Sequence, residues 1–370
     1  PQAAFMAESQ MNKLAEKPGM DPVEIRRINA LKETDTMSVG TLPPNKPTVL
    51  EVIEAAVEKF GWEQYSVISH QSSVSGHQSP VKRGRGFAVG FKNIGFSFGY
   101  KENCWARVEI RGNSAIESVT VWSAAAEVGQ GNHTILAQMA AEVIGVPLEK
   151  IHMIVMDTLE MGNAGSASAS RLTVMSGNAV KGAAELALEK WQNEERPAVA
   201  EYTYLAPPTT PFDKETGYCM PNFLYTYAAQ AVEVEVDTET GMVRVLRVVS
   251  ADDVGKAINP QQLEGQIEGA VVQAQGYAIQ ENFITRGGKV LTDQFSTYLI
   301  PTVLDIPEKV ESVIVEVPVE VGPWGAKGVG ELPYLPLAPA ITAALHDATG
   351  VWFDEFPLTP ERVLRGLGKI

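Results

Sequence analysis

The sequence predicts an α+β fold in which mixed sheets pack against helices. Two patterns carry this prediction: some segments alternate apolar and polar residues as strands do, and others place apolar residues on one helical face. The chain has 370 residues, of which 45% are hydrophobic. This is enough for a large core and for two or three domains.

The first 60 residues are predicted to be mainly helical. The first helix covers residues 2–16, and its apolar face is formed by Phe5, Met6, Met11 and Leu14. A second helix begins after Asp21, whose side chain can cap it, with Pro22 as its first residue. A third begins after Thr48 in a capping-box pattern and runs to about Phe60.

Residues 66–83 are rich in Ser, His and Gln, and we expect a mobile linker or surface excursion there. His70 and His77 lie in this segment without acidic or thiol ligands beside them. We therefore interpret both as surface histidines rather than as metal ligands.

Strand patterns begin after this segment. Strands are predicted at 105–111, 116–123, 150–156 (buried), 227–236, 242–250 and 311–319, with Gly241 in a hairpin turn. Helices are predicted at about 133–144, 174–190, 260–280 and 336–348, and after Thr359. The proline-rich residues 192–222 are predicted to be an irregular surface crossing.

Composition argues against several classes of partner. The formal net charge is -15, from 45 acidic and 30 basic residues, so we expect no binding to nucleic acid or to anionic membranes. No apolar stretch approaches the roughly 20 residues of a membrane span. Residues 1–20 lack a signal-peptide pattern, and Cys104 and Cys219 lack metal-site spacing. Two reduced, packed thiols suit the cytoplasm, where we expect the protein.

Residues 325–331 read GAKGVGE and end in a single carboxylate, Glu331. Glycine lets a ligand approach main-chain N–H groups closely. Burial in such a loop would raise the pKa of Glu331 and make it a usable base near neutral pH. The alternative is a plain turn with a solvated glutamate.

Two further loops of small residues precede predicted helices. Residues 127–131 read EVGQG, and residues 162–171 read GNAGSASASR. Backbone N–H groups at a helix N-terminus can bind an anion, and serine hydroxyls can donate hydrogen bonds. The alternatives are a tight turn for the first loop and a flexible linker for the second. A helix that follows the second loop at once favours ligand binding.

In this order and with this spacing, the loops resemble those of the molybdopterin-binding subunit of the xanthine dehydrogenase group of molybdenum hydroxylases. The resemblance covers almost the whole chain. It implies that Gly330-Glu331 matches the family's glycine–glutamate pair, with Glu331 as the catalytic base. It also implies a set of cofactor-binding residues: Gly129, Gln130, Gly131, Ala169, Ser170, Arg171, Thr173, Gln273, Gly328 and Gly330.

The resemblance implies hydroxylation of an electron-poor carbon with water as the source of oxygen. Purines or other N-heterocycles are the first expectation for the substrate. Aldehyde oxidation, nicotinate-type hydroxylation and a non-catalytic cofactor-binding role are the alternatives. Phe96 and Phe98 are candidates for lining an aromatic substrate pocket, although core packing is the favoured alternative.

The implied cofactor is molybdopterin with molybdenum, with the cytosine dinucleotide as one form. The pterin dithiolene holds the metal, so no side chain need ligate it. Arg171 is expected to contact the phosphate through its guanidinium. Lys327 either offsets the cofactor's charge or is an ordinary surface lysine.

The resemblance also implies partners. Residues 1–2 (PQ) match the tail of a family loop whose earlier part, including an arginine, is absent here. We therefore expect a heteromeric complex: a partner chain with the N-terminal half of the molybdenum subunit, and electron transfer to iron–sulfur clusters and FAD on other subunits. Within this chain we expect an N-terminal segment at 1–83 and two cofactor-binding regions at 84–225 and 226–370.

Overall fold

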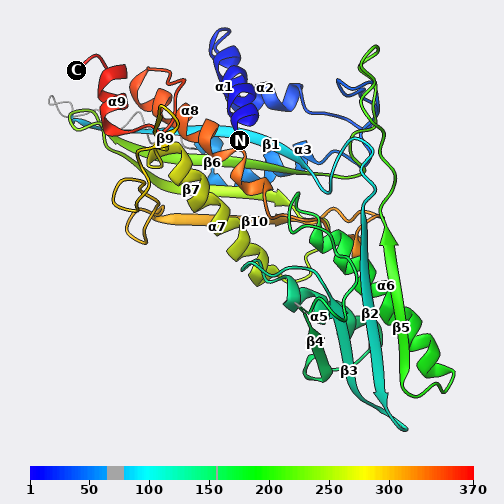
Figure 1. The fold of residues 1–370 in the computed structure, drawn as a ribbon. Coiled ribbons are helices and arrows are strands. Elements are labelled where there is room, and N and C mark those ends of the chain that lie inside the picture. The colour runs from blue at the N-terminus through cyan, green and yellow to red at the C-terminus, as the bar shows by residue number, and fades with distance from the viewer. Residues whose placement is uncertain (65–78, 156) are drawn as a thin grey trace.

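The computed structural model describes residues 1–64, 79–155 and 157–370. It confirms an α+β fold, in which two four-stranded mixed sheets occupy opposite parts of an elongated molecule and helices pack on both (Figure 1). His70 and His77, which we interpret as surface histidines, lie outside the described residues, as does most of the predicted linker.

The first sheet has the strand order β1-β6-β7-β10. Its strands are β1 (Val81–Asn93), β6 (Tyr225–Asp237), β7 (Val243–Asp253) and β10 (Lys309–Val315). The β1, β6 and β7 strands are antiparallel neighbours, and β10 runs parallel to β7. Helix α3 (Val49–Phe60) packs on one face of this sheet and α8 (Leu337–Thr349) on the other, so β6 is buried on both faces.

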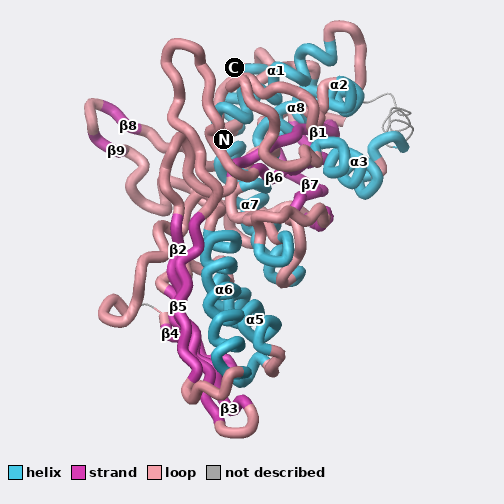
Figure 2. Tube along the Cα trace, turned by 90° about the vertical axis from the view of Figure 1, so that its right-hand side faces the viewer, coloured by secondary structure: helices cyan, strands magenta, loops and turns pink. Residues whose placement is uncertain are grey.

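The second sheet has the order β4-β3-β2-β5. Its strands are β2 (Asn103–Gly112), β3 (Ile116–Ser123), β4 (Ile151–Ile154) and β5 (Ala198–Leu205). Helices α5 (Asn132–Ile144) and α6 (Leu172–Gln192) lie beside these strands (Figure 2) and share one hydrophobic core with them.

The remaining elements surround the two sheets. They are α1 (Gln2–Glu16), α2 (Pro22–Ile28), α7 (Pro260–Ile279), α9 (Pro360–Gly366), β8 (Thr285–Arg286), β9 (Lys289–Val290) and three 3-10 turns, η1 (Leu148–Lys150), η2 (Pro323–Gly325) and η3 (Leu332–Tyr334). None of the helices in the described ranges has the length and apolar character needed to cross a membrane.

The helix boundaries agree with the sequence better than the helix faces do. Asp21 caps α2 by accepting a hydrogen bond from the Val23 N–H group, as predicted. The predicted apolar face of α1 is wrong, because Met6 and Leu14 are exposed. The helix instead buries Glu8, whose carboxylate pairs with Arg26 of α2 at 2.7 Å.

Three predicted segments differ in the structure. The irregular crossing at 192–222 contains β5, an edge strand of the second sheet. The predicted buried strand at 150–156 is the short edge strand β4, whose residues are only partly buried or exposed. Residues 81–83, assigned to the linker, already pair with β6 as the start of β1.

Candidate functional site

Glu331 lies at the end of the loop between β10 and α8, where two cavities meet. Gly330 and Glu331 line both the larger cavity, of about 1130 Å³, and the smaller one, of about 570 Å³. A carboxylate placed at such a junction can face groups bound in either cavity.

Two side chains from distant segments hold the Glu331 carboxylate. The Ser170 hydroxyl donates to Glu331 Oε2 at 3.1 Å, and the Glu331 N–H group donates to Ser170 Oγ at 3.1 Å. The Lys92 ammonium, at the end of β1, lies 3.3 Å from the same Oε2. The Glu331 side chain is 49% exposed, so the described part of the chain does not bury it as expected. No sequence pattern singles out Lys92, because its contact depends on how β1 lies against the loop.

The loop that contains Ser170 lies in direct contact with the glycine loop. A Cβ atom at Gly328 would lie 1.8 Å from the Ser170 carbonyl oxygen, so only glycine fits there. Ala169 and Ser170 both have positive φ, at 53° and 50°, which non-glycine residues seldom adopt. Such strained positions cluster at ligand sites, and here they bring the two predicted loops together.

The Arg171 side chain points into the protein and holds its own loop through hydrogen bonds. Its guanidinium lies 2.6 Å from the Glu102 carboxylate and donates to the carbonyl oxygens of Ala164 and Asn103 at 2.5 and 3.0 Å. The side chain is 1% exposed. The predicted phosphate contact of this guanidinium is therefore wrong, because its donors are directed into the protein.

The predicted anion cradle before α5 is already filled by Glu127. This carboxylate accepts hydrogen bonds from the N–H groups of Gly129 and Gly131, both at 2.9 Å, and of His133 at 3.1 Å. Burial opposes ionisation, but these three donors together hold the pKa of Glu127 below its ordinary value. Nearby, the Gln130 amide donates to the Ala126 carbonyl at 2.7 Å.

Most of the predicted cofactor residues line the smaller cavity. These are Gly129, Gln130, Ser170, Arg171, Thr173, Gly328 and Gly330. Gly131 and Ala169 belong to the same loops without lining the cavity, and Gln273 of α7 lines the larger cavity beside Glu331. The structure therefore brings the separate loops of the sequence to one place.

The polar lining of the smaller cavity includes hydrogen-bond donors and carries little negative charge. Lys256, Ser168 and Thr173 line it, and Glu331 is its one acidic lining residue among those described. Gln262 also lines it, and its buried Oε1 has no hydrogen-bond partner in the described part of the chain. This donor set fits the anionic pterin implied by the resemblance, and the orphaned oxygen can accept from the donor groups of such a ring. No group of three or more His, Cys, Asp or Glu side chains within the described residues is arranged to hold a metal ion.

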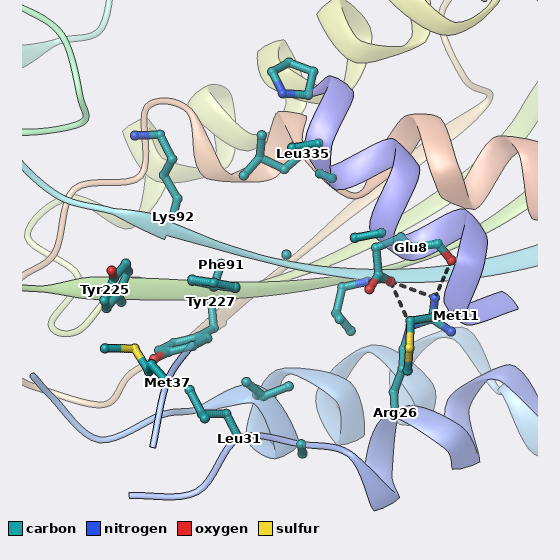
Figure 3. A pocket seen from close by; sticks show the side chains of 18 of the residues that line it. Glu8, Met11, Arg26, Leu31, Met37, Phe91, Lys92, Tyr225, Tyr227 and Leu335 are labelled. Atoms are coloured by element: carbon teal, nitrogen blue, oxygen red, sulfur yellow. Dashed lines mark hydrogen bonds and ion pairs between the residues drawn. The ribbon is translucent and has the colours of Figure 1, made fainter. Parts of the chain in front are cut away.

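The larger cavity has an apolar, partly aromatic wall (Figure 3). Phe91 of β1 packs edge-on against Tyr225 of β6 at 5.5 Å and stacks on Tyr227 at 6.2 Å, and Met37 lies close to these rings. Lys92 lies at one side of the cavity in this view, and the Glu8–Arg26 pair lies at the other.

The predicted aromatic lining by Phe96 and Phe98 does not match this wall. Neither residue lines the two cavities as far as the described residues define them. The Phe96 ring packs against Tyr100 at 5.0 Å, and Phe98 is 56% exposed. The sequence makes these phenylalanines candidates because they precede EVGQG, with core packing as the favoured alternative, which the exposed Phe98 does not fit either. The pairing of β1 with β6 places other aromatic residues at the site.

Lys327 is fully buried and forms an ion pair with Asp253, whose Oδ2 also accepts the Thr48 hydroxyl at 2.6 Å. Burial lowers the pKa of Lys327, although the nearby Asp253 charge opposes this effect. The surface-lysine alternative is therefore wrong.

The predicted capping box of α3 is also wrong. The Thr48 hydroxyl donates to Asp253 and does not cap α3.

The family model described as molybdopterin cofactor-binding domain matches residues 55–203 and 190–307. The chain is 29% identical over 403 residues to a probable xanthine dehydrogenase subunit of Bacillus subtilis (strain 168), covering 100% of this chain and 52% of that one. It is 32% identical over 394 residues to the aldehyde oxidoreductase of Megalodesulfovibrio gigas, covering 99% of this chain and 41% of that one.

The fold comparison agrees. The solved structure of the aldehyde oxidoreductase from Desulfovibrio gigas superposes with a TM-score of 0.88 and 30% sequence identity, over 100% of this chain and 41% of that one. The chain thus spans about half, or less, of the length of the relatives that it matches.

Proposed function

Because the chain belongs to the molybdopterin-binding family of molybdenum hydroxylases, we propose that it is the catalytic, base-bearing portion of a xanthine dehydrogenase-like enzyme. This enzyme hydroxylates a purine or another N-heterocycle, with water as the source of oxygen. The observation that carries the proposal is the position of Glu331 between a donor-lined cavity and an apolar, aromatic one.

The smaller cavity is the proposed cofactor site. It is lined by residues of the loops at 129–131 and 168–173 and by the glycines at 328 and 330, and Gln273 lines the larger cavity, which also contains Glu331. Arg171 contributes by fixing the second loop through Glu102, not by contacting the cofactor's phosphate with its side chain. When bound, the molybdenum cofactor supplies the two-electron oxidation of the substrate carbon.

Glu331 is the proposed general base. Ser170 and Lys92 both hold Oε2, and no hydrogen bond to Oε1 is made within the described residues, so Oε1 is the oxygen that accepts the proton. Fixing one oxygen and leaving the other open orients the base without blocking it. A proton transfer of this kind contributes typically 10²–10⁴-fold to the rate.

The lining of the larger cavity supports the proposed substrate class. Its wall of Phe91, Tyr225 and Tyr227 suits a flat aromatic ring. Similarity to a probable hypoxanthine oxidase and to a probable xanthine dehydrogenase subunit supports a purine, while similarity to an aldehyde oxidoreductase keeps an aldehyde as the alternative. A nicotinate-type heterocycle remains the other alternative. A screen of purines, nicotinate and aldehydes with a dye acceptor distinguishes them.

The proposed partners are a chain with the N-terminal half of the molybdenum subunit and subunits that carry iron–sulfur clusters and FAD. One observation supports a partner surface: the segment after α7 exposes apolar side chains, with Phe295 80% and Leu304 92% exposed. We place the complex in the cytoplasm, with no nucleic-acid or membrane partner.

Metal and pterin analysis of the purified complex tests the cofactor assignment. We expect about one molybdenum and one extractable pterin for each copy of this chain, and release of the pterin will identify its nucleotide form. A complex that contains neither would contradict the proposal. A complex that contains both but oxidises none of the screened substrates would favour the non-catalytic, cofactor-binding role instead.

A further inference from the structure

Three buried side chains form a hydrogen-bonded chain that connects the centre of the first sheet to the turn that follows Glu331. Gln230 of β6 donates through Nε2 to the Pro333 carbonyl at 2.6 Å and to Ser250 Oγ at 2.9 Å. Ser250 lies opposite Gln230 in the β6–β7 register and donates to Asp252 Oδ2 at 2.7 Å. Gln230, Ser250 and Asp252 are all 0% exposed.

The Pro333 carbonyl can only accept, so Gln230 must donate to it through Nε2. When Asp252 is ionised, its carboxylate also only accepts, so the Ser250 hydroxyl donates to it and accepts from Gln230. Gln230 then uses both hydrogens of its amide, one on Ser250 and one on Pro333. Rotating the amide by 180° would place its oxygen against the Pro333 carbonyl oxygen, which is also an acceptor. Only one orientation of the Gln230 amide therefore gives the Pro333 carbonyl a hydrogen-bond donor.

Satisfying buried polar groups does not by itself explain this arrangement. Gln230 Oε1 and Asp252 Oδ1 are both buried and have no partner in the described part of the chain. Burial also raises the pKa of Asp252, against the opposing effect of the Ser250 hydroxyl. An apolar core would avoid these unpaired groups. What the polar chain adds is a fixed position for the Pro333 carbonyl.

Pro333 is only two residues beyond Glu331, and the residue between them, Leu332, is 0% exposed. The η3 turn that contains Pro333 closes with a hydrogen bond from the Leu335 N–H group to the Leu332 carbonyl at 3.0 Å. On the other side of Glu331, Gly328 lies against Ser170. A shift of Pro333 therefore changes the distance between Glu331 and the two groups that hold its carboxylate.

We infer that Gln230 is a positioning residue for Glu331, acting through the Pro333 carbonyl, and that Ser250 and Asp252 hold Gln230 in the required orientation. This inference rests on the proposed role of Glu331 as the base. It concerns residues that lie outside the loops that line the two cavities.

The test compares Gln230→Met and Ser250→Ala in the assembled complex with a matched control, Thr342→Val. The buried Thr342 hydroxyl donates to the Ala338 carbonyl within α8, so its loss also removes a buried hydrogen bond, but away from the Glu331 loop. Misplacing a catalytic group by about 1 Å can cost 10²-fold. We expect kcat to fall about 10- to 100-fold in Gln230→Met and less in Ser250→Ala, with KM and molybdenum content unchanged.

The pH dependence of kcat provides the readout that a purely structural role would not change. We expect the acid side of this profile to shift when Gln230 or Ser250 is replaced, and to stay in place in Thr342→Val. If kcat and the acid side of the profile in Gln230→Met match the control, the inference is wrong. If Gln230→Met does not fold, the same comparison with Ser250→Ala decides. Glu331→Gln, measured in parallel, separates the two claims: unchanged turnover there would contradict the base itself.

Discussion

At Gly328 the glycine loop at 325–331 lies against the loop that contains Ser170. The missing side chain of Gly328 leaves room for the Ser170 carbonyl oxygen, and a Cβ would approach that oxygen to 1.8 Å. Replacement by alanine must therefore push the loops apart and separate Ser170 from Glu331. We expect the Gly328→Ala complex to lose most of its molybdenum and its turnover, as measured by metal analysis and dye reduction.

Gly269→Ala is the matched control for this substitution. Gly269 lies in α7, and a Cβ there meets nothing within 4 Å. Alanine in an exposed helix interior stabilises by up to about 1 kcal/mol. We expect this variant to keep its molybdenum. Equal molybdenum content in both variants would show that the close approach at Gly328 does not matter for the cofactor.

Single residues were predictable from the sequence only where a motif was short and local. The glycine–glutamate pair at 330–331 and the small residues at 169–170 meet in the structure as the sequence suggests. Lys92 was not predictable, because its contact with Glu331 requires two segments far apart in the chain. Arg171 was placed correctly in its loop, but its inward direction depends on Glu102, which carries no motif.

The strand β7 contains a carboxyl group, that of Asp252, whose burial disfavours its ionised form. Asp252 is fully buried, and burial raises its pKa from 3.8 to about 7, with the nearby Asp253 charge acting in the same direction. In the unfolded chain the carboxyl group ionises at its ordinary value. Between about pH 4 and pH 7 the folded state therefore binds more protons than the unfolded state. The contribution of Asp252 to stability must fall as the pH rises through this window.

Asp252→Asn tests this pH dependence, because asparagine keeps a carbonyl acceptor for Ser250 but does not titrate. A shift of about three pKa units corresponds to about 4 kcal/mol as an upper bound. We expect the apparent melting temperature of the wild-type complex to drop more between pH 5 and pH 8 than that of the variant. Equal drops in the two proteins would mean that Asp252 ionises normally when folded.

Elements with local signals were predicted well. Asp21, Asn259 and Thr359 each cap the helix that follows, and Gly145 and Gly350 end their helices in the left-handed conformation. These signals act within a few residues. The strand β5 was missed because prolines surround it and it is recognisable only through its pairing with β2. The buried face of α1 was missed because an ion pair, not apolar spacing, defines it.

At the scale of the whole molecule, pairing between distant segments builds the site. The predicted regions 84–225 and 226–370 meet in the first sheet, where β1 pairs with β6 along its whole length. That pairing places Phe91 and Lys92 beside the cavities. No local pattern encodes such a pairing, so the sequence predicted which loops matter but not which strands bring them together. The division of the chain into three regions stays a prediction.

Turnover of the Glu331→Gln complex tests the central claim most directly. Glutamine keeps the size and the Ser170 contact of this side chain but cannot accept the proton. Glu320→Gln is the control, because Glu320 is exposed, lies on the same segment and lines neither cavity within the described structure.

We predict that Glu331→Gln retains its molybdenum and loses about 10²–10⁴-fold in kcat, while Glu320→Gln retains both its molybdenum and its rate. A Glu331→Gln complex that holds its full molybdenum content and turns over within about tenfold of wild type would show that Glu331 is not the base.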